Sequence, residues 1–275
     1  MKLCPVLFLF GRISFLSILF LVACEHDPVP GPASIKKWEE IPIQANFEVP
    51  APAGRDEEGD ASLELLSDNS LVYTFHIHNL AQGDVLTNAH IHAGDPGTSG
   101  DVLINLNPSF VGAGATGIVK NLRQGQVDSL LNTPVYINVH SAQANAGLVR
   151  GQLDKNIALA MDIALSGNNE DPVVNTTATG QAIIRLTDDK VLYSKVTVNN
   201  LESNDTVTVS HIHRGGAGAN GPVRIFLCAS EADFGLLKIS APLHDSLYHM
   251  LTTDPMYVNV HSRRHGPGII RGQVR

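Results

Sequence analysis

The chain has 275 residues, of which 19 are Lys or Arg and 27 are Asp or Glu, so its formal net charge is -8 at pH 7. This acidic balance, with no long basic run, argues against binding to nucleic acid. The 24 glycines, the 15 prolines and an aromatic content of 5% favour many turns and short strands in one or two globular domains.

The N-terminal segment resembles the signal of a bacterial lipoprotein. Its apolar run ends in the sequence LVAC, and a small residue before a cysteine at this position is typical of a lipobox. We therefore expect cleavage of residues 1–23 and lipidation of Cys24, for example by palmitate. The alternative is an uncleaved membrane anchor. Either form would hold the protein in the bacterial cell envelope, and we expect the outer membrane or the cell surface.

Residues 24–40 are expected to form a spacer behind this anchor. The segment contains the Pro-rich, polar stretch EHDPVPGPASIKK, which has no hydrophobic period. With Cys4 in the signal and Cys24 lipidated, Cys228 is the last thiol of the mature chain, so we expect no internal disulfide. Its setting in RIFLCA is typical of a small buried strand residue rather than of a reactive thiol.

An internal repeat with a constant offset of 121 residues organises the rest of the chain. The motif HIH at 90–92 recurs at 211–213, YINVHS at 136–141 recurs as YVNVHS at 257–262, and RGQ at 150–152 recurs at 271–273. A period of this length predicts tandem domains rather than a solenoid. We expect a first domain at residues 41–153 and a second at residues 157–275.

Each copy predicts an all-β fold. Segments such as LVYTFHIHNL, DVLINL, PVYINVH and LVRGQL are separated by clusters of Gly, Asn, Asp and Pro. They fit two tandem antiparallel domains, each a Greek-key β-sandwich or a flattened barrel. Apolar residues spaced about three or four apart predict one short helix per copy, within residues 112–132 and 230–251.

The motif strands carry an unusual polar face. Residues two apart on a strand share a face, so each motif offers an apolar row for the core and a polar row. If the motif strands are neighbours, the polar rows form one cluster per copy. In the first copy this cluster comprises His90, His92, Asn138, His140, Arg150 and Gln152. In the second copy it comprises His211, His213, Asn259, His261, Arg271 and Gln273.

A metal site is one use of such a cluster. Three imidazoles per copy suit zinc or copper, and a His-x-His pair with a distant third histidine is a familiar ligand spacing on β-sandwiches. The candidate ligands are His90, His92 and His140 in the first copy and His211, His213 and His261 in the second.

Catalysis and structural support are the other uses. An imidazole-based hydrolase would need a nucleophile, but Ser141 and Ser262 follow a histidine directly, so alternation aims them away from it. In a structural network, the polar groups would bond to one another and to the carbonyls of the glycine loop. We favour this network, with no cofactor, because an arginine beside a divalent metal is unfavourable.

Two further features call for a structural explanation. His76 and His78 form another His-x-His, but Thr197 and Asn199 stand at the repeat offset, so we expect these histidines to face solvent. The glycines at 94, 97 and 100 precede a strand rather than a helix. We expect them to occupy turn positions with positive φ instead of holding a phosphate.

The combined motifs resemble the chordin-type (CHRD) domain. AHIHAGDPGTSGDVLINL followed by YINVHSAQANAGLVRGQL is similar to its signature of HIH, a Gly-rich loop, NVH and a closing RGQ, and the second copy is as close. Glu48-Val49-Pro50 and Glu170-Asp171-Pro172 resemble the family's early Glu-x-Pro. The resemblance implies an extracellular binding or structural module rather than an enzyme. We expect a membrane-anchored module whose partner is an extracellular protein or a glycan.

Overall fold

The computed structural model describes residues 31–275. The predicted signal peptide, the predicted lipidation site Cys24 and residues 24–30 of the expected spacer lie outside the described residues. Residues Pro32–Arg275 form one compact unit that holds both domains. Within the described part, no helix has the length and apolar character needed to span a membrane.

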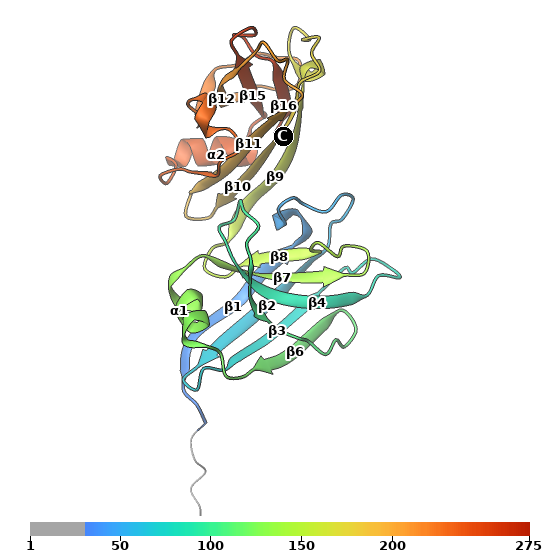
Figure 1. The fold of residues 1–275 in the computed structure, drawn as a ribbon, viewed down its shortest axis with the longest axis vertical. Coiled ribbons are helices and arrows are strands. Elements are labelled where there is room, and N and C mark those ends of the chain that lie inside the picture. The colour runs from blue at the N-terminus through green and yellow to red at the C-terminus, as the bar shows by residue number, and fades with distance from the viewer. Residues whose placement is uncertain (1–30) are drawn as a thin grey trace, which may run out of the picture. The chain divides into compact units, whose positions relative to one another are not determined.

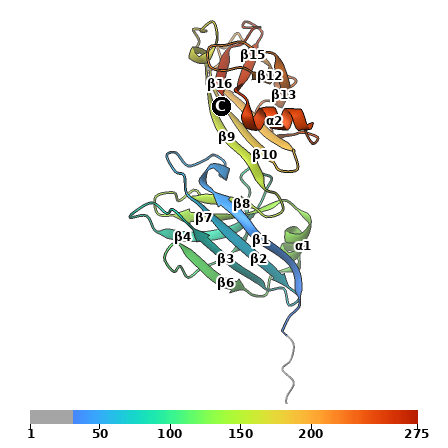
Figure 2. The ribbon, with the colours of Figure 1, turned by 180° about the vertical axis from the view of Figure 1, so that it is seen from behind.

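Each domain is built on one eight-stranded antiparallel sheet (Figures 1 and 2), which confirms the predicted all-β fold. The first sheet has the order β5-β4-β7-β8-β1-β2-β3-β6. Its strands are β1 (Ser34–Gln44), β2 (Glu58–Leu66), β3 (Leu71–Ile77), β4 (Leu86–Ala93), β5 (Val102–Asn105), β6 (Gly114–Val119), β7 (Val135–Ser141) and β8 (Val149–Gln152).

The second sheet repeats this order as β13-β12-β15-β16-β9-β10-β11-β14. Its strands are β9 (Ile157–Ser166), β10 (Thr179–Thr187), β11 (Leu192–Asn199), β12 (Val207–Arg214), β13 (Val223–Cys228), β14 (Lys238–Ile239), β15 (Met256–Ser262) and β16 (Ile270–Gln273). Here β13 also approaches β11, so the second sheet nearly closes on itself.

The helices confirm the predicted position before the PVY and PMY strands. They are α1 (Gln124–Asn132) and α2 (Asp245–Thr253), and short 3-10 turns occupy η1 (Ala45–Phe47), η2 (Gly167–Asn169) and η3 (Glu231–Asp233). In α1 the buried residues Val127 and Leu130 are three apart and share one helical face. Residues before α1 form β6 instead of extending the helix, because their backbone pairs with β3 in the sheet.

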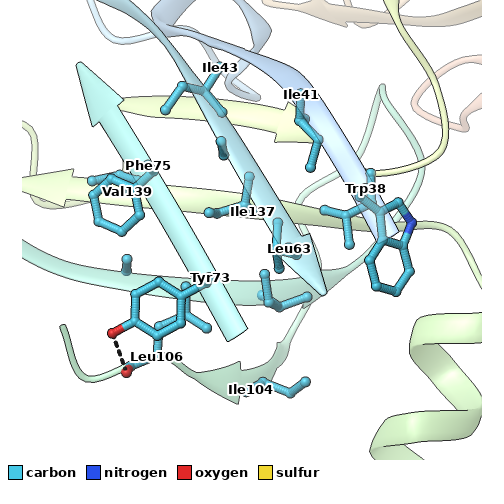
Figure 3. Close-up of a cluster of buried hydrophobic side chains, with 14 of the residues drawn as sticks. Trp38, Ile41, Ile43, Leu63, Tyr73, Phe75, Ile104, Leu106, Ile137 and Val139 are labelled. Carbon is cyan, nitrogen blue, oxygen red and sulfur yellow. Dashed lines mark hydrogen bonds between the residues drawn. The ribbon is translucent and has the colours of Figure 1, made fainter. Parts of the chain in front are cut away.

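Alternation along the strands builds the first core, shown in Figure 3. In β3, Tyr73, Phe75 and Ile77 are buried while the residues between them are more exposed. Ile137 and Val139 of β7 join the same apolar cluster. The Tyr73 hydroxyl donates a hydrogen bond of 3.1 Å to the Leu106 carbonyl, which satisfies the one polar group that this ring buries.

The folded part starts earlier than the sequence indicated. The expected spacer ran to residue 40, but its last seven residues lie in β1. Trp38 is 4% exposed and pairs with Leu63 of β2, and Ile41 is 3% exposed. Burial of these apolar side chains stabilises the strand, so the spacer is correspondingly shorter.

Candidate metal centre

Strand register brings the predicted polar residues together on three neighbouring strands, β4, β7 and β8 (Figure 1). Asn138 lies opposite both His90 and Arg150. Tyr136 lies opposite both His92 and Gln152. The second domain repeats this register on β12, β15 and β16, where Asn259 lies opposite His211 and Arg271, and Tyr257 opposite His213 and Gln273. The structure divides each cluster into three parts.

The first part is a loop clamp, formed by Arg150 and Gln152 in the first domain. The Arg150 guanidinium is fully buried and donates hydrogen bonds of 2.6 Å to the Thr98 carbonyl and 2.7 Å to the Asp95 carbonyl. The Gln152 amide donates to the Gly94 carbonyl at 2.7 Å. These bonds satisfy loop carbonyls that the fold buries.

The loop clamp of the second domain, Arg271 and Gln273, makes the same kind of bonds. Arg271 donates to the carbonyls of Gly216 at 2.8 Å and Ala219 at 2.9 Å. Gln273 donates to the Gly215 carbonyl at 2.9 Å. The predicted bonds between guanidinium or amide groups and glycine-loop carbonyls are therefore present in both domains.

A tyrosine ring joins the loop clamp to the histidines. The Arg150 guanidinium lies 3.4 Å from the centre of the Tyr136 ring, and the His92 ring stacks on Tyr136 at 5.1 Å with an angle of 10°. The Tyr136 hydroxyl accepts a hydrogen bond from the Gly100 amide. Arg150 thus directs its charge to a ring and to carbonyls. Burial lowers the pKa of His92, and the positive charge of Arg150 nevertheless adds to this effect, so the sequence-based argument that the arginine disfavours a metal still applies.

The second part of the cluster is the imidazole triad, His90, His92 and His140. His92 Nδ1 donates to the Gly100 carbonyl at 2.8 Å, and His140 Nδ1 donates to the Asn145 carbonyl at 3.0 Å. A carbonyl can only accept, so in the neutral rings both Nε2 atoms are left with a lone pair.

The ligand atoms of this triad converge. His140 Nε2 lies 3.1 Å from His90 Nδ1, and one nitrogen from each ring can be chosen so that all lie within 4.8 Å of one another. His92 Nε2 is buried and has no hydrogen-bond partner among the described residues. The two rings of the His-x-His pair are 5.4 Å apart.

The second imidazole triad, His211, His213 and His261, has the same geometry. His213 Nδ1 bonds to the Gly221 carbonyl at 2.9 Å, and His261 Nδ1 bonds to the Gly266 carbonyl at 2.7 Å. His261 Nε2 lies 3.1 Å from His211 Nδ1. His213 Nε2 is again buried without a partner within residues 31–275. The two domains therefore build one arrangement twice.

Burial keeps these imidazoles neutral. Burial is the main cause, and the neighbouring His140 and His92 add to it, so that the pKa of His90 is lowered to about 4. Burial likewise lowers the pKa of His211 to about 4. The pKa values of His92, His140 and His213 are also lowered, mainly by burial. A neutral imidazole is the form that coordinates a metal.

The third part is a buried pair of Asn138 and Glu48, which the sequence did not assign to the cluster. Asn138 Nδ2 donates to Glu48 Oε2 at 3.1 Å, and burial raises the pKa of Glu48 to about 8. A Cβ on Gly147 would lie 2.7 Å from Glu48 Oε1, so only glycine leaves room for this carboxyl. The recurring Glu-x-Pro was the available signal. In the second domain, Asn259 donates to Glu170 at 3.3 Å.

The backbone angles of the glycine loop differ from the prediction, which was positive φ at all three glycines. Gly94 has a φ of 152°, as expected, but Gly97 and Gly100 do not have positive φ. Gly100 is required for a different reason, because a Cβ there would lie 1.5 Å from the Ala93 carbonyl oxygen. The prediction of positive φ was therefore wrong for Gly97 and Gly100.

The other histidine pair and the lone thiol lie outside this site. His76 and His78 are exposed, as predicted, and His78 contacts Asp60 at 2.7 Å. Cys228 is 1% exposed, which confirms its predicted burial, and this burial raises its pKa to about 12.

The serines that follow the third histidines belong to a separate cluster. Ser141 is buried and donates to Asp84 at 2.7 Å, which confirms that it points away from the imidazoles. Asp84 also pairs with Arg55, which in turn holds Glu57 at 2.5 Å. Sequence reasoning missed this ion cluster because Arg55 and Glu57 have no counterparts at the repeat offset, where Thr176 and Ala178 stand.

Comparison with known families agrees with this architecture. The family model for the CHRD domain matches the chain twice, at residues 41–153 and 161–274. No match was found among curated proteins or among solved structures. Since the two family matches cover most of the chain and coincide with the two sheets, the chain belongs to the CHRD domain family.

Proposed function

We propose that this chain is a lipid-anchored, extracytoplasmic binding module in which each CHRD domain holds one zinc or copper ion on its imidazole triad. The observation that carries this proposal is the buried Nε2 atom of His92, and of His213 in the second domain, which has no partner in the described part of the chain. A buried polar atom without a partner costs about 1–3 kcal/mol, and here the cost recurs at the same position in both domains.

A closed hydrogen-bond network explains less of the geometry than a metal does. Hydrogen bonds account for the loop clamp and for the contact between His90 and His140. They leave the lone pair of His92 Nε2 unused. A metal bound at about 2.0–2.1 Å from each nitrogen would use that lone pair together with one nitrogen from each of the other two rings.

The spacing of the ring nitrogens supports the same conclusion. Tetrahedral coordination at that bond length separates neighbouring ligand nitrogens by about 3.3 Å. The 3.1 Å between His90 Nδ1 and His140 Nε2, repeated between His211 and His261, is close to this value. Imidazole ligands suit zinc and copper among the common metals. The carbonyls that accept from Nδ1 would orient the rings, as in many metal sites.

The remaining features of the proposal rest on the sequence and the family. The LVAC sequence supports a lipid on Cys24 and a location in the bacterial cell envelope. The tandem CHRD domains support binding rather than catalysis. An extracellular protein or a glycan is the partner class that fits such a module, with the metal ions as part of its structure or its binding surface.

Elemental analysis tests the metal proposal directly. The full-length protein would be extracted in detergent, purified without a histidine tag and loaded with zinc or copper. We expect about two ions per chain, about one in H92A or H213A, and none in the double variant. His78→Ala, which changes an exposed histidine, serves as the control and should retain both ions. A wild-type protein that binds no stoichiometric metal, with H92A and H213A changing only thermal stability, would establish the network instead.

Mass spectrometry tests the anchor separately. We expect the mature N-terminus at Cys24 with attached acyl chains in membrane fractions. The C24A variant should carry no lipid, so no lipid anchor should hold it in the membrane. A wild-type chain without lipid at Cys24 would contradict the anchor and leave the metal proposal intact.

A further inference from the structure

The two imidazole triads differ in the residue that lies beside their first histidine. In the first domain, Asn105 of β5 lies opposite His90, and its side-chain amide opposes the lowering of that imidazole's pKa by burial. In the second domain, Phe226 of β13 lies opposite His211. The Phe226 ring contacts the His211 ring edge-on, with centroids 4.4 Å apart and an angle of 90°. A polar neighbour in one site is thus replaced by an apolar one.

The exposure of the ligands differs accordingly. All three histidines of the first triad are half-buried. In the second triad, His211 and His213 are each 8% exposed, and His261 alone is half-buried. Phe226 itself is 66% exposed, so its ring lies over the site from the solvent side rather than belonging to the core. An apolar ring therefore covers one edge of His211, whereas a polar residue lies opposite His90.

The charges around the two triads also differ. Asp101 lies close enough to His92 for its charge to act on that imidazole, whereas Pro222 occupies the corresponding position in the second domain. The loop after the third histidine has the sequence AQA in the first domain and RRH in the second. The second loop thus has Arg263 two residues after His261, where the first loop has Ala142. The first site is thus the more favourable one for a doubly charged ion.

Ion charge and hydration convert these differences into selectivity. The cost of moving an ion into a less polar environment rises with the square of its charge, so a dry site penalises a divalent ion more than a monovalent one. Zinc with three protein ligands keeps a water molecule as its fourth ligand, which needs access to solvent. Cuprous ion is monovalent, and three imidazole ligands suffice for it without a bound water. A hydrogen bond to a ligating imidazole raises its basicity and favours the divalent ion.

We infer that the two sites select different ions, with the first triad preferring a divalent ion such as zinc and the second preferring cuprous copper. This inference rests on the proposed function, because it assumes that both triads bind metal. The selecting residues are Asn105 and Phe226, which adjoin ligands without being ligands themselves. They act on ion preference through a polar neighbour in one site and an apolar cover in the other.

Single-site variants of the full chain isolate the two sites. H213A leaves the first triad, and H92A leaves the second. For each we would measure the affinity for Zn²⁺, and the affinity for Cu⁺ without oxygen in competition with a chromogenic cuprous chelator. The ratio of cuprous to zinc affinity should be at least tenfold higher at the second site.

Exchanging the neighbouring residue tests the cause. F226N in the H92A background should lower the ratio about tenfold, and N105F in the H213A background should raise it by a similar factor. Both positions are exposed, so the exchanges leave the core unchanged. F226L, which keeps an apolar cover, is the matched control and should retain most of the cuprous preference.

The outcomes separate this inference from the proposal beneath it. Equal ratios at the two sites, or ratios that the exchanges do not move, would overturn the selectivity while leaving two metal sites. Absence of stoichiometric binding of either ion at both sites would overturn the proposed function itself.

Discussion

The two domains share their sheet order, their loop clamps and the positions of their imidazole nitrogens, yet they differ in what surrounds these groups. The first domain has a buried ion cluster of Arg55, Glu57 and Asp84. In the second, Asp205 keeps the corresponding serine contact with Ser262 at 2.6 Å, without such an arginine. The shared groups define the site, and the variable ones set the stability and selectivity of each copy.

The largest effect is expected from disrupting the ion cluster that the first domain has and the second lacks. Arg55→Ala should lower the free energy of unfolding of the first domain by about 3–5 kcal/mol, because Glu57 and Asp84 would remain as buried charges without their partner. Trp38 is the one tryptophan of the chain and is buried in the first domain, so its fluorescence reports this loss. Lys37→Ala, which removes an exposed ion pair with Glu64, is the control and should cost less than about 1 kcal/mol. An R55A chain as stable as wild type would show that the cluster contributes nothing.

The loop clamps should behave alike in the two domains. Arg150→Ala and Arg271→Ala each leave loop carbonyls without a donor and remove a cation–π contact. We expect each to destabilise its own domain by about 2–4 kcal/mol. Hydrogen exchange, read separately on β7 and β15, measures the two losses. A loss in one domain alone would mean that the clamps are not equivalent.

The buried carboxyls should make stability fall as pH rises. Burial raises the pKa of Glu170 from 4.5 to about 7, although Arg271 opposes this shift. Between these values the unfolded chain has released a proton that the folded domain retains, so ionisation favours unfolding as pH rises from 4.5 to about 7. Glu170→Gln cannot ionise and should gain about 2–3 kcal/mol relative to wild type between pH 5 and pH 8.

The corresponding variant in the first domain sharpens this comparison. Because the pKa of Glu48 is raised to about 8, the gain of Glu48→Gln should continue to a higher pH than that of Glu170→Gln. Denaturant titrations across this pH range measure both profiles. Gains that are flat with pH would show that neither carboxyl retains its proton in the folded protein.

The smallest effect is expected at the exposed histidine pair. His78 and Asp60 are each about half exposed, and such surface pairs contribute about 0–1 kcal/mol. His78→Ala should therefore change stability by less than about 0.5 kcal/mol. Chemical denaturation measures this change, and a loss comparable to that of R150A would contradict the assignment of His78 to the solvated face.

Much of the fold could be predicted because it depends on local patterns. The offset of 121 residues, the alternation along β3 and the turn residues together predicted two tandem β domains. The same alternation predicted that His90 and His92 share a face and that Ser141 turns away from them. The start of the first domain was predicted less accurately. The apolar residues Trp38 and Ile41 lie next to a polar spacer, and their burial depends on pairing with β2.

Sequence alone determined which residues form the polar cluster in each domain, because the alternation of side chains along a strand is a property of the backbone. Only the tertiary structure decided how the cluster divides. The hydrogen bonds of Arg150, the burial of Glu48 and the partnerless Nε2 of His92 depend on loops that reach the strands from positions 52 to 90 residues away. A strand pattern shows which face a histidine occupies. It cannot show which of its two nitrogens finds a carbonyl and which is left for a metal.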